Sequence, residues 1–239
     1  MFILIAVTDV FGWPSIRTRK APSLRVIEER LRGENLCTRR EAVEDLKDHG
    51  GRGIPYLLGV ILQNCDSSIR AAAASTLGKL EIYMGGRRDI RSFSKALNDE
   101  NREVRVATAN ALIRKGFAQT QSAKLLSVLL EALNHGSRYE RHEAIIGLEN
   151  LGPIAKSAIG SLAASIEDID PWINFQAAVA LGKIDPANER TRAALRTIRL
   201  YPDSEVGILA QGILNGDSSL MSPRGIFDLF TLRCSPKKT

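Results

Sequence analysis

Cysteine, histidine and aromatic residues are scarce in this 239-residue chain, and their scarcity argues against several kinds of site. The three cysteines, Cys37, Cys65 and Cys234, form no CxxC pair, which argues against a disulfide framework or a zinc ribbon and favours the reducing cytoplasm. The apolar start, residues 1–7, is far shorter than the roughly 20 apolar residues of a membrane span. None of the three histidines stands opposite a plausible nucleophile, so no catalytic triad can be assigned. We therefore expect no catalytic residues and no cofactor.

What the sequence does contain is a pattern that recurs every 31 to 36 residues. Each copy has an anchor, usually an arginine after an apolar residue, followed by small residues and a leucine at fixed offsets. The anchors are Arg39, Arg70, Arg105, Arg141, Asn174 and Gly207. A period of this length is typical of stacked helical hairpins. The sequence therefore predicts an all-α fold, a right-handed α-solenoid of about six helical hairpins over residues 24–214.

Local signals divide each hairpin into two helices. The first helices are expected at 24–33, 53–64, 88–98, 119–134, 153–167 and 187–200, and the anchors lie on the second helices. Asp66, Asp99 and Asp170 precede second helices as residues that can cap free backbone N–H groups. Residues 1–23 lack a helical period and are expected to form an irregular lead-in, and residues 215–239 a C-terminal cap and flexible tail.

The stretches around the anchors resemble HEAT repeats, in particular the Ala-, Leu- and Gly-rich kind called phycobilisome-lyase HEAT-like repeats. These stretches are residues 70–80, 105–112, 141–152 and 174–184. The resemblance implies that the second helices line the concave side of the solenoid. It also implies a ladder between neighbouring repeats, built from the aspartate before a second helix and the arginine inside it. Asn174 and Gly207 depart from the ladder pattern, whereas the residues that match it are Asp66, Asp99, Arg70, Arg105 and Arg141.

Candidate binding residues follow from the geometry of the second helices. With each anchor at position zero, the residues at +1, +5 and +9 share a helix face opposite the packed Ala and Leu residues. Four such rows predict a groove with an apolar floor and a charged edge, which suits a peptide or a helix. The expected partner-binding residues are His142, Ile146, Phe175, Val179, Arg114, Lys183 and Asn110. The alternative is that Phe175 and Val179 pack against an adjacent helix.

These features favour a non-catalytic scaffold or adaptor that binds a protein partner through its concave face. Arg114 and Lys183 are expected to steer an acidic or amphipathic segment of that partner.

Two alternatives come from other classes of protein. The net charge of +6 is compatible with nucleic acid, as in the HEAT-like DNA glycosylases. The repeat resemblance also implies a bilin lyase or chromophore chaperone, in which Lys79, Arg114 and Lys183 would bind propionates. His142 and Glu143 resemble the His-Glu pairs that hold the di-iron centre of deoxyhypusine hydroxylase, another HEAT-repeat protein. Since one pair cannot bind two irons, we expect no metal site.

Overall fold

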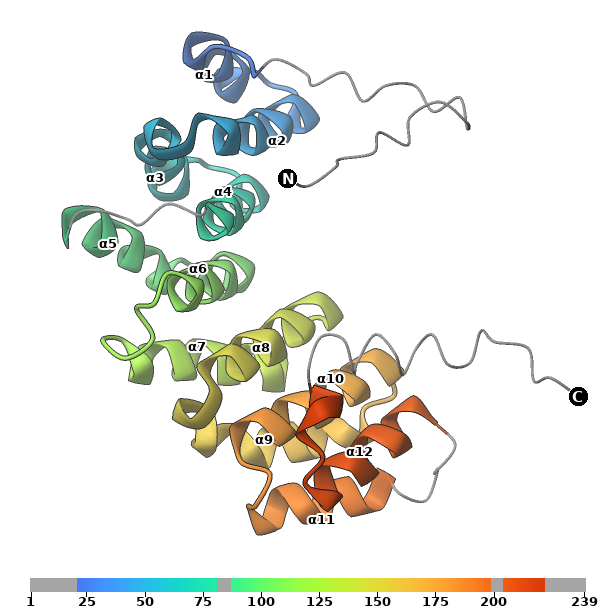
Figure 1. The fold of residues 1–239 in the computed structure, drawn as a ribbon. Coiled ribbons are helices and arrows are strands. Elements are labelled where there is room, and N and C mark those ends of the chain that lie inside the picture. Colours follow the sequence, from blue (N-terminus) through green and yellow to red (C-terminus); the bar gives the residue numbers. More distant parts are fainter. Residues whose placement is uncertain (1–20, 81–86, 199–203, 222–239) are drawn as a thin grey trace, which may run out of the picture.

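The helices of this chain stack one above another into an elongated body (Figure 1). The structure is a computed structural model that describes residues 21–80, 87–198 and 204–221. The expected lead-in therefore lies almost wholly outside the described residues. Among the helices that are described, none has the length and apolar character needed to cross a membrane.

Each hairpin pairs a first helix with a second helix. The first helices are α1 (Leu24–Arg32), α3 (Ile54–Gln63), α5 (Arg87–Ser94), α7 (Ser122–His135), α9 (Ile159–Ala164) and α11 (Glu189–Ile198). The second helices are α2 (Leu36–Asp45), α4 (Ser67–Lys79), α6 (Arg102–Arg114), α8 (Arg138–Leu151), α10 (Pro171–Ile184) and α12 (Glu205–Asn215). Short 3-10 segments adjoin them: η1 (Leu46–Gly53), η2 (Lys95–Asn98), η3 (Gly152–Ala158), η4 (Ser165–Glu167) and η5 (Ser218–Met221).

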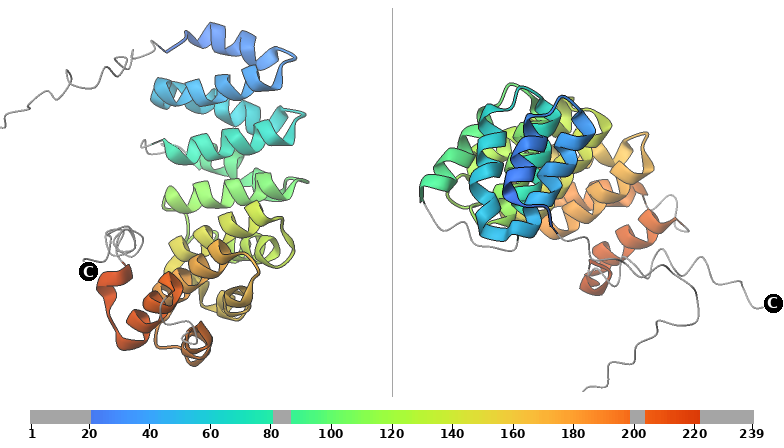
Figure 2. Two further views of the ribbon diagram at one scale, coloured as in Figure 1. Left: turned by 90° about the vertical axis from the view of Figure 1, so that its right-hand side faces the viewer. Right: turned by 90° about the horizontal axis from the view of Figure 1, so that it is seen from above.

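The hairpins form a solenoid because each second helix packs against the next, from α2 through to α12. In Figure 1 the first helices α3, α5, α7 and α9 lie along one side of the stack, and α4, α6 and α8 lie along the other. The two turned views in Figure 2 show the same layered arrangement. The predicted all-α solenoid of helical hairpins is confirmed.

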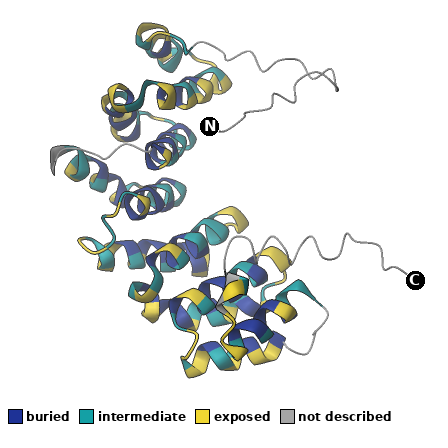
Figure 3. Cartoon of the chain, in the orientation of Figure 1, coloured by how far each residue is buried: buried dark blue, intermediate teal, exposed yellow. Residues whose placement is uncertain are grey.

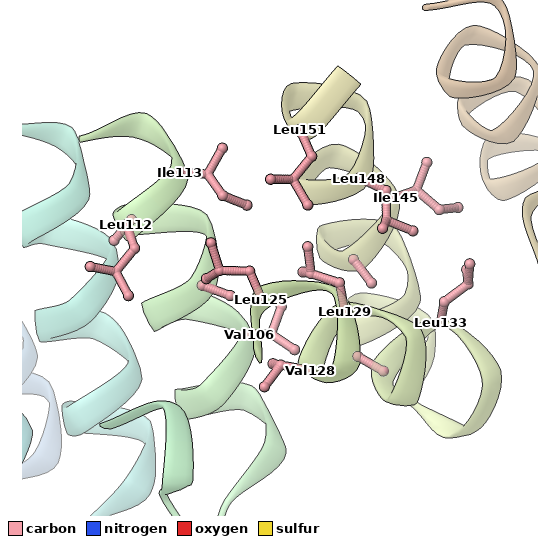
Figure 4. Close-up of a cluster of buried hydrophobic side chains, with 14 of the residues drawn as sticks. Val106, Leu112, Ile113, Leu125, Val128, Leu129, Leu133, Ile145, Leu148 and Leu151 are labelled. Carbon is pink, nitrogen blue, oxygen red and sulfur yellow. The ribbon is translucent and has the colours of Figure 1, made fainter. Parts of the chain in front are cut away.

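A continuous hydrophobic core runs between the two columns of helices (Figure 3). In one layer of it, Leu112 of α6, Leu129 of α7 and Leu148 of α8 are fully buried (Figure 4). Small residues set the spacing of the second helices. A Cβ placed on Gly78 of α4 would lie 2.7 Å from the Cβ of Ala111 on α6. The two helices therefore pack almost backbone to backbone.

Most of the predicted helix boundaries follow from local chemistry. The carboxylates of Asp66 and Asp170 accept backbone N–H bonds at the starts of α4 and α10, as predicted for N-caps. The expectation that Asp99 caps α6 is wrong: the cap is Asn101, and Asp99 accepts the backbone N–H of Asn101 at 2.9 Å. The single helix expected at 153–167 is also wrong. It is divided into η3, α9 and η4, since Ala155 within η3 has a ψ of 17° and breaks the helical path.

A ladder of arginines joins successive hairpins, as the resemblance to HEAT repeats implies. Arg70 of α4 donates to both carboxylate oxygens of Asp99, at 2.8 Å each. Arg141 of α8 lies 3.3 Å from a carboxylate oxygen of Asp168. Arg39 of α2 lies 3.8 Å from Asp66, which precedes α4. Arg105 departs from the implied pattern, since it pairs with Glu131 inside the first helix α7 rather than with an aspartate before a second helix.

Asp99 does not cap a helix, and its carboxylate accepts hydrogen bonds from Arg70 of the ladder instead. Burial alone would raise the pKa of Asp99, but the hydrogen bonds from Arg70 and from the N–H of Asn101 outweigh burial and hold the pKa below its ordinary value. Arg70 also donates to the carbonyl oxygen of Asn64, at 3.0 Å, in the turn before its own helix. One guanidinium therefore joins two consecutive hairpins.

At the C-terminal end, η5 folds back onto α12. Leu220 packs over Gly212, where an added Cβ would collide with the Leu220 side chain. The apolar residues expected to cap the stack farther along, at 226–232, lie outside the described residues. The three predicted segments of the chain, with their boundaries at 23/24 and 214/215, stay a prediction.

Candidate binding groove on the second helices

A cavity of about 200 Å³ opens between α2, α4, α6 and α8, and we call it the central cavity. Small apolar side chains supply part of its lining: Ala71, Ala72, Val106 and Ala107. On α6 the lining residues are Glu103, Val106, Ala107, Asn110 and Arg114, which follow the i, i+3, i+4, i+7 spacing of a single helix face. Side chains of α2 and α8 complete the cavity: Arg40, Glu44, Tyr139, Glu140 and Glu143.

Carboxylates outnumber cations on this lining, with four glutamates and two arginines. Burial raises the pKa of Glu103, and the nearby charge of Glu140 raises it further, against a smaller opposing effect of Arg40. Burial likewise raises the pKa of Tyr139, and the charges of Glu143 and Glu103 add to that effect. The central cavity is therefore locally negative although the chain as a whole carries a net charge of +6.

Asn110 connects α6 to α8 at the central cavity. Its amide nitrogen donates to a carboxylate oxygen of Glu143 at 2.9 Å and to the Glu143 carbonyl at 3.0 Å. The residue is only 4% exposed, and its amide oxygen has no hydrogen-bond partner among the described residues. Its predicted place on the exposed face is therefore wrong, because the pairing with α8 draws the side chain inward.

Three rings lie together where α8 meets α10, and we call Tyr139, His142 and Trp172 the aromatic patch. The His142 and Trp172 rings stack with centroids 6.3 Å apart. Tyr139 is 57% exposed and Trp172 is 44% exposed. The patch borders a second hollow of about 340 Å³, which shares Tyr139 with the central cavity. The two hollows therefore adjoin along the second helices, from α2 to α10.

The structure brings only some of the predicted binding residues to this surface. Arg114 lines the central cavity, and His142 belongs to the aromatic patch. Ile146 is half-buried and lines neither hollow. The Lys183 ammonium pairs with Glu149 at 2.5 Å.

Phe175 and Val179 do not form an exposed floor; they are only 4% and 3% exposed. The packing alternative holds for both, since α10 contacts α8, α9, α11 and α12 as well as three of the 3-10 segments. Phe175 also stacks on Trp172, with ring centroids 6.0 Å apart. The middle of α10 is therefore covered by its neighbours, whereas Trp172 in its first turn is exposed.

Sequence reasoning missed Glu103, Tyr139 and Trp172, which all stand two residues before an anchor. The predicted rows started at position +1 from each anchor, about one helical turn after these residues at position −2, and so did not include them. Extending each row by three residues toward the N-terminus would have found this set, because i and i+3 share a helix face. The His142–Glu143 pair, 3.9 Å apart, belongs to no group of three His, Cys, Asp or Glu residues placed to hold a metal within the described ranges.

Comparison with known families finds a match to HEAT repeats over residues 126–212. No curated protein sequence matches this chain.

Three solved structures resemble the fold over most of its length. The Escherichia coli protein YibA has a TM-score of 0.62 and 18% identity, over 84% of this chain and 73% of that one. The complex of CpcE and CpcF of phycocyanin lyase from Nostoc has a TM-score of 0.55 and 19% identity, over 92% of this chain and 85% of that one. A designed armadillo repeat protein in complex with the peptide (KR)4 has a TM-score of 0.58 and 16% identity, over 82% of this chain and all (100%) of that one. At these identities the likenesses extend to the fold alone.

Proposed function

We propose that this chain, whose residues 126–212 match HEAT repeats, is a non-catalytic scaffold that binds a segment of a protein partner along its second helices. The observation that carries the proposal is the aromatic patch beside the central cavity. Two large rings, Tyr139 and Trp172, stay substantially exposed at adjoining positions of neighbouring repeats. Exposed aromatic residues next to a hollow are typical of contact sites for polypeptides.

The shape of the surface favours an extended or helical segment rather than a small molecule. The central cavity and the second hollow adjoin across successive repeats, so one segment could follow the stack and contact both. The designed armadillo protein of similar fold holds a peptide, which supports the same use of this solenoid.

Of the two predicted kinds of partner segment, acidic and amphipathic, the charges favour the amphipathic one. Lys183 already pairs with Glu149, which leaves its charge less available to an acidic partner. Arg114 shares the central cavity with an excess of glutamates. A segment with an apolar side for the aromatic patch and a polar side for the central cavity fits this surface best.

The test is capture of a partner by the full chain and by two variants. Trp172→Ala removes an exposed ring of the aromatic patch. Leu62→Ala, on the first helix α3, removes a comparably exposed apolar side chain and serves as the control. We expect proteins that bind the wild type from native lysate, at physiological and at high salt and after nuclease treatment, to bind Leu62→Ala equally and Trp172→Ala weakly. Circular dichroism should be the same for all three chains.

Three results would contradict the proposal. Undiminished capture by Trp172→Ala would place the binding surface elsewhere. Loss of all capture after nuclease treatment would favour nucleic acid instead, and a coloured eluate with visible absorbance would favour a bilin.

A further inference from the structure

We propose that the central cavity receives a basic side chain, arginine or lysine, from the partner segment, and that Glu103 is the carboxylate that pairs with it. This inference rests on the proposed function and adds the chemistry of the ligand. The occupant we expect is a peptide segment with a lysine or arginine placed to enter the cavity while an adjacent apolar residue contacts the aromatic patch.

Glu103 stands out among the four glutamates because the other three are already engaged. Glu44 lies 3.8 Å from Lys47. Glu140 accepts the N–H of Ser137 in the cap of α8, and Glu143 accepts from Asn110. Among the described residues, Glu103 has no hydrogen bond and no ion pair, and the cation that acts on it, Arg40, has a smaller effect on its pKa than burial does. A carboxylate that is partly withdrawn from water and has no partner is costly, and a cation from outside would remove that cost.

A further feature of the cavity fits a basic side chain. Tyr139 and Glu103 line the same cavity, and the charge of Glu103 contributes to the raised pKa of the neutral Tyr139 phenol. An aromatic ring near a carboxylate suits an ammonium or guanidinium group.

The size of the cavity limits what can enter it. Pockets that enclose drug-sized molecules occupy about 300–1,000 Å³. The central cavity, at about 200 Å³, is smaller and suits one long side chain rather than a whole ligand. The partner's backbone would then run outside the cavity, across the second helices.

The positive net charge of the chain makes binding of a basic peptide an informative test of the central cavity. A chain with a net charge of +6 repels a basic peptide on average, so binding of such a peptide requires a local negative site. The probe is a fluorescein-labelled octapeptide of alternating lysine and arginine, titrated with the full chain and followed by fluorescence anisotropy. A labelled octapeptide of alternating glutamate and serine is the opposite-charge control.

The key variant is Glu103→Gln, which keeps the size of the side chain and removes its charge. Its matched control is Glu100→Gln, which changes the net charge equally at a side chain that is 88% exposed and three residues away. We expect Glu103→Gln to weaken binding of the basic octapeptide by about tenfold or more, as for loss of a charged hydrogen-bonded partner. Glu100→Gln should change it by less than about twofold.

A second pair of variants examines the aromatic contribution. Tyr139→Phe keeps the ring and should bind nearly as well as wild type, whereas Tyr139→Leu should bind several-fold more weakly. Circular dichroism and thermal unfolding check that every variant is folded.

The inference is overturned if the wild type fails to bind the basic octapeptide, if it prefers the acidic one, or if Glu103→Gln and Glu100→Gln behave alike. None of these results affects the capture experiment with Trp172→Ala. If that capture persists and depends on Trp172, the proposed function stands while the basic ligand is rejected. If the peptide binds through Glu103 but Trp172→Ala has no effect on capture, the proposed function falls instead.

Discussion

Replacing Arg70 by alanine breaks the most deeply buried rung of the arginine ladder. The Arg70 side chain is 8% exposed and that of Asp99 is 11% exposed, and two hydrogen bonds of 2.8 Å join them. The substitution leaves the Asp99 carboxylate buried with only the N–H of Asn101 and the more distant charge of Arg105 to stabilise it. It also leaves the carbonyl of Asn64 without this donor.

Loss of one partner from a buried ion pair costs about 3–5 kcal/mol. Because Asp99 keeps the N–H of Asn101, we expect the free energy of unfolding to fall by about 3 kcal/mol for Arg70→Ala. The control is Arg25→Ala, which removes an exposed i,i+4 pair with Glu29 and should cost at most about 0.5 kcal/mol. Urea unfolding followed by circular dichroism measures both.

The location of the effect provides a second measurement. Since each repeat of a solenoid contacts only its neighbours, hydrogen exchange should accelerate in α4 and α6 and change little in α11. The double variant Arg70→Ala/Asp99→Ala should be more stable than Arg70→Ala alone, because it removes the stranded charge. A loss below about 1 kcal/mol, or a double variant less stable than the single one, would refute the reasoning that Asp99 is stranded.

The ladder also predicts how stability depends on pH. The folded-state pKa of Asp99 lies below its ordinary value of 3.8, so the folded chain binds this proton less readily than the unfolded chain. The stabilisation from Asp99 is therefore complete above the ordinary pKa and is lost as the pH falls through the lowered value. Arg70→Ala should flatten this part of the stability profile, which urea unfolding across the acid range would measure.

Three further predictions concern stability. At neutral pH Glu103→Gln should raise the free energy of unfolding by up to about 0.5 kcal/mol. The raised pKa of Glu103 means that its ionised form destabilises the fold, and solvent around the side chain limits the effect. A lower urea midpoint for the variant would contradict this. Gly78→Ala should lower the free energy of unfolding by about 1–3 kcal/mol, since the new Cβ would press on Ala111. As the control, Gly59→Ala in α3, where a Cβ would meet nothing within 4 Å, should be neutral or stabilising by up to about 1 kcal/mol. Equal urea midpoints for the two variants would rule out the close packing of α4 and α6. Phe175→Ala should cost about 3–4 kcal/mol because the ring is buried, and an unchanged melting temperature would show instead that Phe175 lies at the surface.

The course of the helices could be predicted because their signals are local. Each anchor sits at a fixed distance from small residues and a leucine, and a helix-period pattern of this kind identifies the second helices without tertiary information. Asp66 and Asp170 were recognisable as caps because a cap bonds to backbone groups two or three residues away. As a cap, Asp99 was misassigned because α6 begins only at Arg102, where Asn101 is the cap.

The candidate site was only partly predictable. The helix face that carries Asn110, Arg114 and His142 follows from the register of the second helices. Its exposure does not, since Asn110 turned inward to Glu143 and Phe175 was covered by neighbouring helices. Sequence-wide charge was also misleading, because a net charge of +6 conceals a cavity with an excess of glutamates.

By itself, then, the sequence determined the repeat period, the helical hairpins and the residues that recur on each helix, because these depend on spacing along one chain. Tertiary structure alone decided which recurring residues remain at the surface and which charges come together. Glu103 and Glu140 stand 37 positions apart in the chain, and only the packing of α6 against α8 brings their charges within range of each other. The burial of Phe175 and the place of Glu103 in a cavity with three other glutamates both arise from contacts between repeats, which no single repeat encodes.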